Sequence, residues 1–248
     1  MPQENNLSTN SILEFNNVSF GYNQDNIILK QISLSLEAGK TYALVGPTGG
    51  GKTTTAGLMV RLFDPLEGTV EFKNRDIRTY KPEELAQSIG YILQEPFLFS
   101  GTISDNLLYG NNELENSGLK GLRSKLSSLE LDDVLTRFPE GLDTVVNNNS
   151  ENISLGQKQL VAFTRILLRK PQLLIMDEAT ANIDTVTELW LNKIIDKLPE
   201  NTTKVIIAHR LNTIKDADHI LFINNGKITA AMNFNEALNL IESSKRQS

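Results

Sequence analysis

The chain has 248 residues, 40% hydrophobic and 22% charged, which is enough for one large domain or two lobes with a real core. Its net charge of −6 argues against a protein that coats nucleic acid, and the absence of cysteine excludes disulfides and Cys-ligated zinc. The apolar runs are far shorter than the ~20 residues that span a bilayer. Residues 1–10 are polar and are interpreted as a linker or tail without a signal-peptide core.

Short runs with strand character dominate the first seventy residues. They are apolar or alternating, and they predict strands at 12–20, 26–36 and 41–46. Helical spacing then predicts a helix over 52–63, and strand patterns return at 68–72 and 88–93.

The middle of the chain changes character, because residues 102–138 are rich in Leu, Ser, Asn and Glu with helical spacing. This pattern predicts a helical lobe inserted into the surrounding core. Helices and buried strands then alternate, with helices at 156–170 and 185–198 and strands at 171–178 and 204–209. Residues 219–232 predict a hairpin that turns at Asn224-Asn225-Gly226. The alternation indicates an α/β fold with a mainly parallel core.

The sequence GPTGGGKT, residues 46–53, fits the pattern G-x-x-x-x-G-K-[ST] between a predicted strand and a predicted helix. Glycines let backbone N–H groups turn inward around phosphate oxygens, and a helix N-terminus adds positive potential. Lys52 supplies a cation for the outer phosphates, and the Thr53 hydroxyl a ligand for Mg²⁺. The predicted nucleotide-binding residues are Gly46, Pro47, Thr48, Gly49, Gly50, Gly51, Lys52, Thr53 and Thr54. The alternative is a glycine-rich turn before an ordinary helix.

Two acidic residues end the buried run LLIMDE, residues 173–178. Ligands of open α/β sheets bind at the carboxyl ends of the strands, where Asp177 and Glu178 are placed. Asp177 is predicted to hold Mg²⁺, and Glu178 to polarise an attacking water. The alternative is a strand that ends in solvated acids.

The order of Tyr22, GPTGGGKT, Gln94, NISLGQ, LLIMDE, NID and His209 resembles the nucleotide-binding domain of ATP-binding-cassette (ABC) proteins, over about residues 13–240. The resemblance implies a P-loop NTPase core with a mainly parallel sheet and an N-terminal antiparallel β subdomain. It implies one ABC ATPase domain over 11–248, with an α-helical subdomain inserted at about 100–170.

The resemblance also implies roles for single residues. Tyr22 is expected to stack on adenine, although it is also placed to cap a strand. Gln94 is expected to touch Mg²⁺ and the attacking water, and His209 the γ-phosphate. Asp184 is expected to organise the partner subunit's site. The implied catalytic set is Glu178, His209, Gln94 and Lys52, and the implied metal ligands are Thr53, Gln94 and Asp177.

The turn NISLGQ, residues 152–157, resembles the signature of this family. The signature lies across a dimer interface, so that each ATP is held between one chain's phosphate loop and the other chain's signature. Ser154 is expected to give a hydroxyl to the γ-phosphate and Gly156 a backbone N–H, with Gln157 beside them. Leu155 stands where a glycine would be the easy choice. A leucine is compatible with function unless positive φ is required there, because the amide donates whatever its side chain is.

The segments QEPFLFSGTISDNLLYG, residues 94–110, and FDPLEGTVEF, residues 63–72, resemble the exporter branch. This implies an ATPase at the cytoplasmic face of the membrane, which uses ATP and Mg²⁺, pairs with the same or a different ABC ATPase domain and drives a transmembrane domain. Phe97, Leu98 and Phe99 are predicted to form an apolar surface for a helix, with core packing as the alternative. The asparagine-rich loop 147–149 departs from the family's Gly-Glu-rich turn, which raises the chance of an asymmetric heterodimer.

Two other functions remain open from the sequence. One is a soluble ABC ATPase that acts on nucleic acid or ribosomes, which the negative charge disfavours and salt-sensitive binding would support. The other is a nucleotide-binding regulator without turnover, which a comparison with Glu178→Gln would distinguish.

Overall fold

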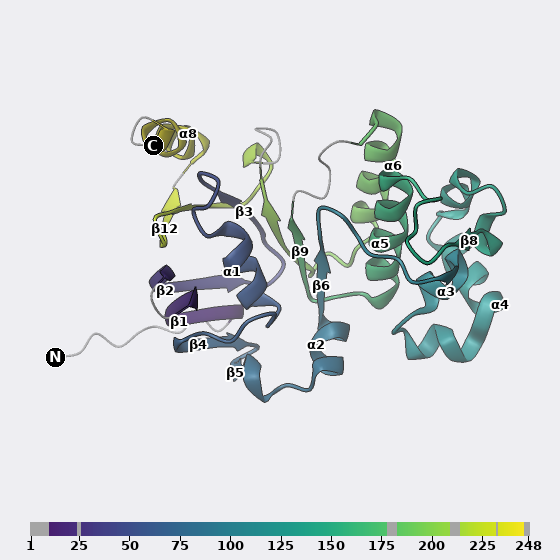
Figure 1. Ribbon diagram of the computed structural model, residues 1–248, viewed down its shortest axis with the longest axis horizontal. Helices are drawn as coiled ribbons and strands as arrows, with labels where there is room; N and C mark the ends of the chain where they lie inside the picture. Colours follow the sequence, from purple (N-terminus) through teal and green to yellow (C-terminus); the bar gives the residue numbers. More distant parts are fainter. Residues whose placement is uncertain (1–9, 24–25, 178–182, 209–213, 232, 246–248) are drawn as a thin grey trace. The chain divides into compact units, whose positions relative to one another are not determined.

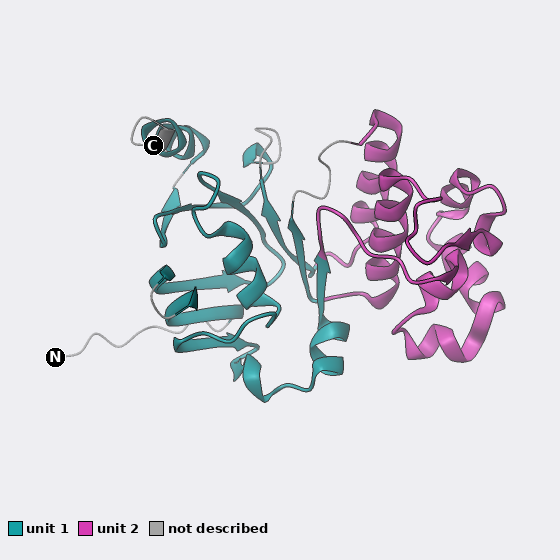
Figure 2. Cartoon of the chain, viewed as in Figure 1, with its two compact units in different colours: residues 1–91, 172–178, 201–248 teal, residues 92–171, 179–200 magenta. Residues whose placement is uncertain are grey.

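The computed structural model describes residues 10–23, 26–177, 183–208, 214–231 and 233–245 (Figure 1). The chain divides into two compact units, which are described separately (Figure 2). The first contains residues 1–91, 172–178 and 201–248, and the second contains residues 92–171 and 179–200.

An antiparallel sheet opens the first unit, with the strand order β2-β1-β4-β5. Its strands are β1 (Ser11–Asn23), β2 (Asn26–Glu37), β4 (Glu67–Phe72) and β5 (Arg75–Asp76). In register, Leu13 faces Leu36 and Phe15 faces Leu34. The paired apolar residues give this sheet a buried face, as the alternating sequence predicts.

A second sheet of the first unit has the order β12-β11-β3-β10-β9-β6. Its strands are β3 (Thr41–Val45), β6 (Ile89–Ile92), β9 (Leu173–Asp177), β10 (Thr203–Ile207), β11 (His219–Asn224) and β12 (Lys227–Ala231). Strands β11, β3, β10 and β9 are parallel neighbours, whereas β12 is antiparallel to β11. The mainly parallel sheet and the C-terminal hairpin are therefore confirmed. The hairpin turns through Asn225 and Gly226, whose φ angles are 49° and 75°.

The helices of the first unit differ from the predictions in two places. The helices whose bounds the described residues give in full are α1 (Lys52–Met59), α2 (Pro82–Ser88), the 3-10 turn η1 (Ile77–Thr79) and α8 (Phe234–Lys245). The prediction that the first helix runs to residue 63 is wrong, because Arg61 has a φ of 57° and the Leu62 N–H closes the last turn on the carbonyl of Gly57 at 2.8 Å. Helix α2 was not predicted, although Pro82 is its first residue and Glu84 accepts from the Lys81 N–H at 2.9 Å.

The second unit is mainly helical, and the predicted helices of 102–138 are present in it. It contains α3 (Ile103–Leu108), α4 (Asn112–Ser128), the 3-10 turns η2 (Asp132–Arg137) and η3 (Gly141–Asp143), α5 (Leu155–Arg169) and α6 (Thr185–Asp196), with a strand pair β7 (Gly101–Thr102) and β8 (Val145–Val146). No helix of the described ranges is both long and apolar enough to cross a membrane.

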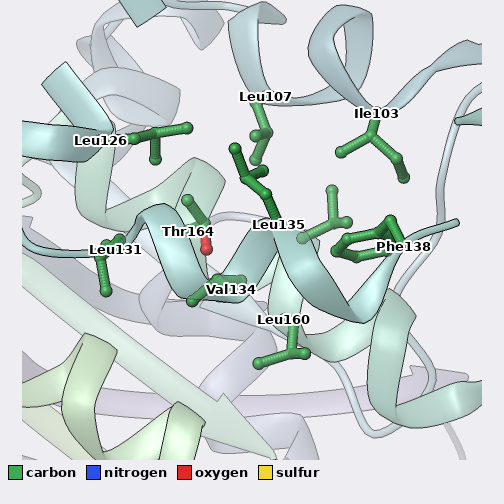
Figure 3. Close-up of a pocket in the computed structure, with 10 residues that line it drawn as sticks. Ile103, Leu107, Leu126, Leu131, Val134, Leu135, Phe138, Leu160 and Thr164 are labelled. Atoms are coloured by element: carbon green, nitrogen blue, oxygen red, sulfur yellow. The ribbon is translucent and has the colours of Figure 1, made fainter. Parts of the chain in front are cut away.

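A small cavity of about 10 Å³ lies in the apolar interior of this unit (Figure 3). It is lined by Ile103, Leu107, Leu126, Leu131, Val134, Leu135, Phe138, Leu160, Val161 and Thr164. Nine of these ten side chains are apolar, and the hydroxyl of Thr164 is buried without a hydrogen-bond partner among the described residues. A water molecule needs two to four polar partners, so this lining favours a dry cavity.

Candidate functional site

The loop between β3 and α1 is built on glycines in conformations that other residues avoid. The φ angles of Gly46, Gly49 and Gly51 are 145°, 76° and 107°. A Cβ on Gly46 would lie 2.0 Å from the carbonyl oxygen of Ile223, and one on Gly51 would lie 2.7 Å from Cδ2 of Leu29. The loop therefore depends on glycine for both its dihedral angles and its close packing.

Lys52 begins α1 and folds back over this loop. Its ammonium donates to the carbonyl oxygens of Gly46 and Pro47, at 3.0 Å each, and the residue is only 6% exposed. Thr48 and Gly49 form the exposed tip, and the Gly50 N–H closes the turn on the carbonyl of Pro47 at 3.1 Å. A glycine cradle, an ammonium and a helix N-terminus are the groups that bind a polyphosphate, so this loop fits the phosphates of a nucleotide.

Asp177 ends β9 in the same sheet. Parallel pairing sets Asp177 level with Ile207, and Ile207 level with Leu44, so Asp177 lies at the height of the strand that feeds the loop. Thr53 is exposed in the first turn of α1. One hydroxyl and one carboxylate completed by waters suit Mg²⁺, which usually keeps several waters. Glu178 and His209 lie outside the described residues.

Tyr22 lies at the end of β1 beside the first turn of α1. Its hydroxyl and that of Thr54 are 3.2 Å apart, and either can donate the hydrogen bond. On β6, burial first, then the charge of Asp177 and then Tyr22, raise the pKa of Tyr91 to about 12. The raised pKa keeps the Tyr91 hydroxyl protonated well above the range in which tyrosine usually ionises.

The predicted signature forms the start of α5 in the second unit. Ser154 caps the helix, since its Oγ accepts from the Gln157 N–H at 3.2 Å and its own N–H donates to Gln157 Oε1 at 2.9 Å. Leu155 is the first helical residue and is not among the residues with positive φ. The conformational obstacle that leucine would have met at this position is therefore absent. Among the described residues, the N–H groups of Leu155 and Gly156 have no partner, which leaves two donors for an anion.

In the second unit, Thr187 on α6 contacts both Asp184 and Gly156. Asp184 caps α6 by accepting from the Thr187 N–H at 3.0 Å and from its hydroxyl at 2.6 Å. These hydrogen bonds from Thr187 lower the pKa of Asp184. A Cβ on Gly156 would lie 3.0 Å from Thr187 Oγ1, so the close approach of the two helices favours glycine there.

Gln94 follows β6, belongs to the second unit and is exposed. Its carbonyl accepts from Gln159 Nε2 on α5 at 3.3 Å. The residues after it resolve the alternatives for the apolar cluster, because Leu98 is fully buried whereas Phe97 is 63% exposed. The rings of Phe97 and Phe99 lie 5.2 Å apart, and those of Phe99 and Tyr109 lie 4.3 Å apart. We call Phe97, Phe99 and Tyr109 the aromatic patch.

Hydrogen bonds of Asn106 and Arg165 connect this patch to α5. Neither residue was predicted from the sequence to have a role. Asn106 accepts from the Phe99 N–H and donates to the Phe99 carbonyl, at 2.8 Å each. Arg165 donates to the carbonyl of Asn106 at 2.7 Å and to its Oδ1 at 2.8 Å. Burial lowers the pKa of Arg165 to about 10. The sequence signal for this pair was weak, because the buried faces of both helices also carry other polar residues, Ser104 on α3 and Gln159 on α5.

Comparisons with known proteins agree with this geometry. Residues 29–181 match the family described as ABC transporter. The chain is 42% identical over 222 residues to the uncharacterized ABC transporter ATP-binding protein YfiC of Bacillus subtilis, which is 90% of this chain and 36% of that protein. It is 38% identical over 226 residues to a fatty acid ABC transporter ATP-binding/permease protein of Mycobacterium tuberculosis, which is 91% of this chain and 35% of that protein.

A solved structure of a bacterial Atm1-family ABC exporter with ATP bound is similar in fold. Its TM-score is 0.82 at 33% identity, and the match covers 97% of this chain and 42% of that chain. The chain thus spans about a third of the length of the curated relatives it matches. It belongs to the ABC transporter family and corresponds to the ATP-binding domain of the exporter-type members.

Proposed function

We propose that this chain binds ATP with Mg²⁺ and hydrolyses it as the nucleotide-binding domain of an ABC exporter, in one ATPase domain over residues 11–248 with a helical subdomain at about 100–170. The observation that carries the proposal is the loop 46–51, whose positive-φ glycines stand between a buried strand and a helix N-terminus. The exporter with ATP bound, which resembles 97% of this chain, adds support.

The roles of the site residues follow from their chemistry. Lys52 neutralises the outer phosphates, and the backbone N–H groups of the loop hold the phosphate oxygens. Thr53, Asp177 and Gln94 are the proposed holders of Mg²⁺, which when bound offsets the charge of the phosphates. Glu178 is proposed to accept the proton of the attacking water, and His209 to contact the γ-phosphate.

A second ABC ATPase domain, identical or different, is the proposed partner across the nucleotide. The start of α5 offers the Ser154 hydroxyl and two N–H groups without a partner in the part of the chain that the structure describes, and such groups favour an anion at a helix N-terminus. These donors would meet the γ-phosphate of the ATP that the partner's phosphate loop holds. Asp184, which caps α6, is proposed to organise that shared site.

The aromatic patch is the proposed contact with a transmembrane domain at the cytoplasmic face of a membrane. Phe97 is 63% exposed and Tyr109 is 52% exposed, and exposed apolar clusters of this kind mark interaction sites. Through Asn106 and Arg165 the patch is hydrogen-bonded to α5, the helix that begins at Ser154. This connection is the proposed route by which a movement at the patch would reach the signature.

The proposal is tested by measuring MgATP binding to the chain and phosphate release by the complete transporter. Lys52→Ala is expected to lose nucleotide affinity. Glu178→Gln is expected to keep ATP affinity and to lose phosphate release, because only the water activation is removed. Equal phosphate release from Glu178→Gln and the unchanged protein would remove Glu178 from the chemistry. Failure of the unchanged chain to bind MgATP would refute the nucleotide-binding function.

A further inference from the structure

The ring of Tyr22 is held from two sides by phenylalanines that lie outside the nucleotide motifs. Tyr22 is 55% exposed, which suits a platform for a planar base. Its ring centroid lies 5.3 Å from that of Phe63, at an interplanar angle of 84°, and 5.4 Å from that of Phe20, at 85°. The rings of Phe20 and Phe63 are themselves 5.3 Å apart. All three rings touch one another, so the tilt of Tyr22 depends on Phe63.

Phe63 reaches this position because α1 carries a glycine where the ring lies. A Cβ on Gly57 would stand 2.9 Å from Cε2 and 3.1 Å from Cδ2 of Phe63. Glycine destabilises the interior of a helix, so a glycine in α1 is explained best by close packing. The ring of Phe63 packs against Gly57, where a larger residue would contact it too closely.

The hydroxyl of Tyr22 is held by the same helix. It shares a hydrogen bond with Thr54, which directly follows the proposed metal ligand Thr53. Helix α1 therefore carries the proposed phosphate-binding residues in its first turn and, beside them, Thr54, the partner of the Tyr22 hydroxyl. One turn further on, the same helix carries Gly57, against which the ring of Phe63 packs. This arrangement fixes the ring of Tyr22 relative to the phosphate loop.

We propose that Phe63, seated on Gly57, is a positioning residue for Tyr22 and sets the affinity of the site for the base of the nucleotide, but not for its phosphates. The proposal rests on the function proposed above, because it requires that Tyr22 is the base platform. It predicts that ligands with and without a base respond differently to changes at Phe63. A residue with a merely structural role would alter both responses together.

The test measures by calorimetry the dissociation constants of MgATP and of magnesium tripolyphosphate, which has no base. Phe63→Leu removes the edge-on ring contact and is expected to weaken MgATP by about threefold to tenfold and to leave tripolyphosphate unchanged. Phe63→Tyr keeps an aromatic ring at this position and is expected to retain the affinity of the unchanged protein for MgATP. Gly57→Ala is expected to repeat the loss for MgATP without lowering the Tm, since alanine favours the helix but displaces the ring.

Leu62→Ala is the matched control, because Leu62 is the exposed neighbour of Phe63 and is expected to change neither constant. An equal change for both ligands, or no change for MgATP with Phe63→Leu, would overturn the positioning role. Tyr22→Ala separates the two proposals. If Tyr22→Ala weakens MgATP and Phe63→Leu does not, only the positioning role is lost. If Tyr22→Ala has no effect on MgATP, the base platform is refuted and the positioning role with it.

Discussion

Replacing Thr164 by valine is expected to stabilise the second unit, because it removes a buried hydroxyl that has no hydrogen-bond partner among the described residues. Thr164 is 2% exposed, and the other cavity-lining side chains are apolar (Figure 3). An unsatisfied buried hydroxyl costs roughly 1–3 kcal/mol, and a buried methyl contributes about 0.8 kcal/mol. Threonine and valine have similar helix propensities. The lower bounds together give an increase of about 2 kcal/mol in the free energy of unfolding.

The assay is urea unfolding followed by circular dichroism, with hydrogen exchange of the α5 amides to locate the effect in this unit. Thr187→Val is the matched control, because Thr187 is equally buried but its hydroxyl donates to Asp184 at 2.6 Å. The same substitution is therefore expected to lower the free energy of unfolding at Thr187 and to raise it at Thr164. A loss of stability in Thr164→Val would refute the reasoning and would indicate a bound water in the cavity.

Four further outcomes follow from other contacts. Gly46→Ala is expected to cost roughly 1–3 kcal/mol and to abolish MgATP binding, because its φ is 145° and its Cβ would meet a carbonyl oxygen; calorimetry showing retained affinity would contradict this. Asn106→Ala is expected to lower the free energy of unfolding by roughly 2 kcal/mol or more, since the N–H and carbonyl of Phe99 lose their partner; a urea midpoint near that of the unchanged chain would argue against it. Leu155→Gly is expected to give no gain in phosphate release by the complete transporter, because Leu155 already lies in the helix; a large gain would show that the leucine is a handicap. Hydrogen bonds from Thr187 lower the pKa of Asp184, so the stability that its carboxylate gives to α6 is fully present above the ordinary aspartate pKa and is lost as the pH falls through the lowered value. Amide hydrogen exchange in α6 measures this loss of stability. The variant Asp184→Asn should remove the pH dependence.

The order and type of the main elements could be predicted because their periodicity is local. The buried runs of β3 and β9 and the amphipathic α5 are each legible within a few residues. The end of α1 was not predictable from the pattern, because the residue that takes the left-handed conformation there, with a φ of 57°, is Arg61 and not the glycine that usually marks a helix end. Helix α2 had its signals, a proline followed by acidic residues, but was too short to show a period.

The site divides in the same way. The phosphate loop is a continuous motif, so its residues and their glycine requirement were predictable. Phe63 packs against Gly57, six residues before it, and Asn106 is hydrogen-bonded to Phe99, seven residues before it. Such contacts depend on the path of the backbone between them, which no residue pattern specifies. The role of Leu155 was conditional on its φ angle, and only the three-dimensional structure supplies that angle.

The first two residues of α5 differ in how many substitutions they can tolerate. The two donors there that have no partner within the described ranges are main-chain N–H groups, and every residue except proline has one. Position 155 can therefore accept many side chains over evolutionary time without losing its donor, provided that they tolerate the first turn of a helix. Position 156 has less latitude, because a Cβ there would lie 3.0 Å from Oγ1 of Thr187, which would have to shift to admit it. A mutational scan of the two neighbouring positions should show that position 155 is the more permissive and that glycine is favoured at position 156.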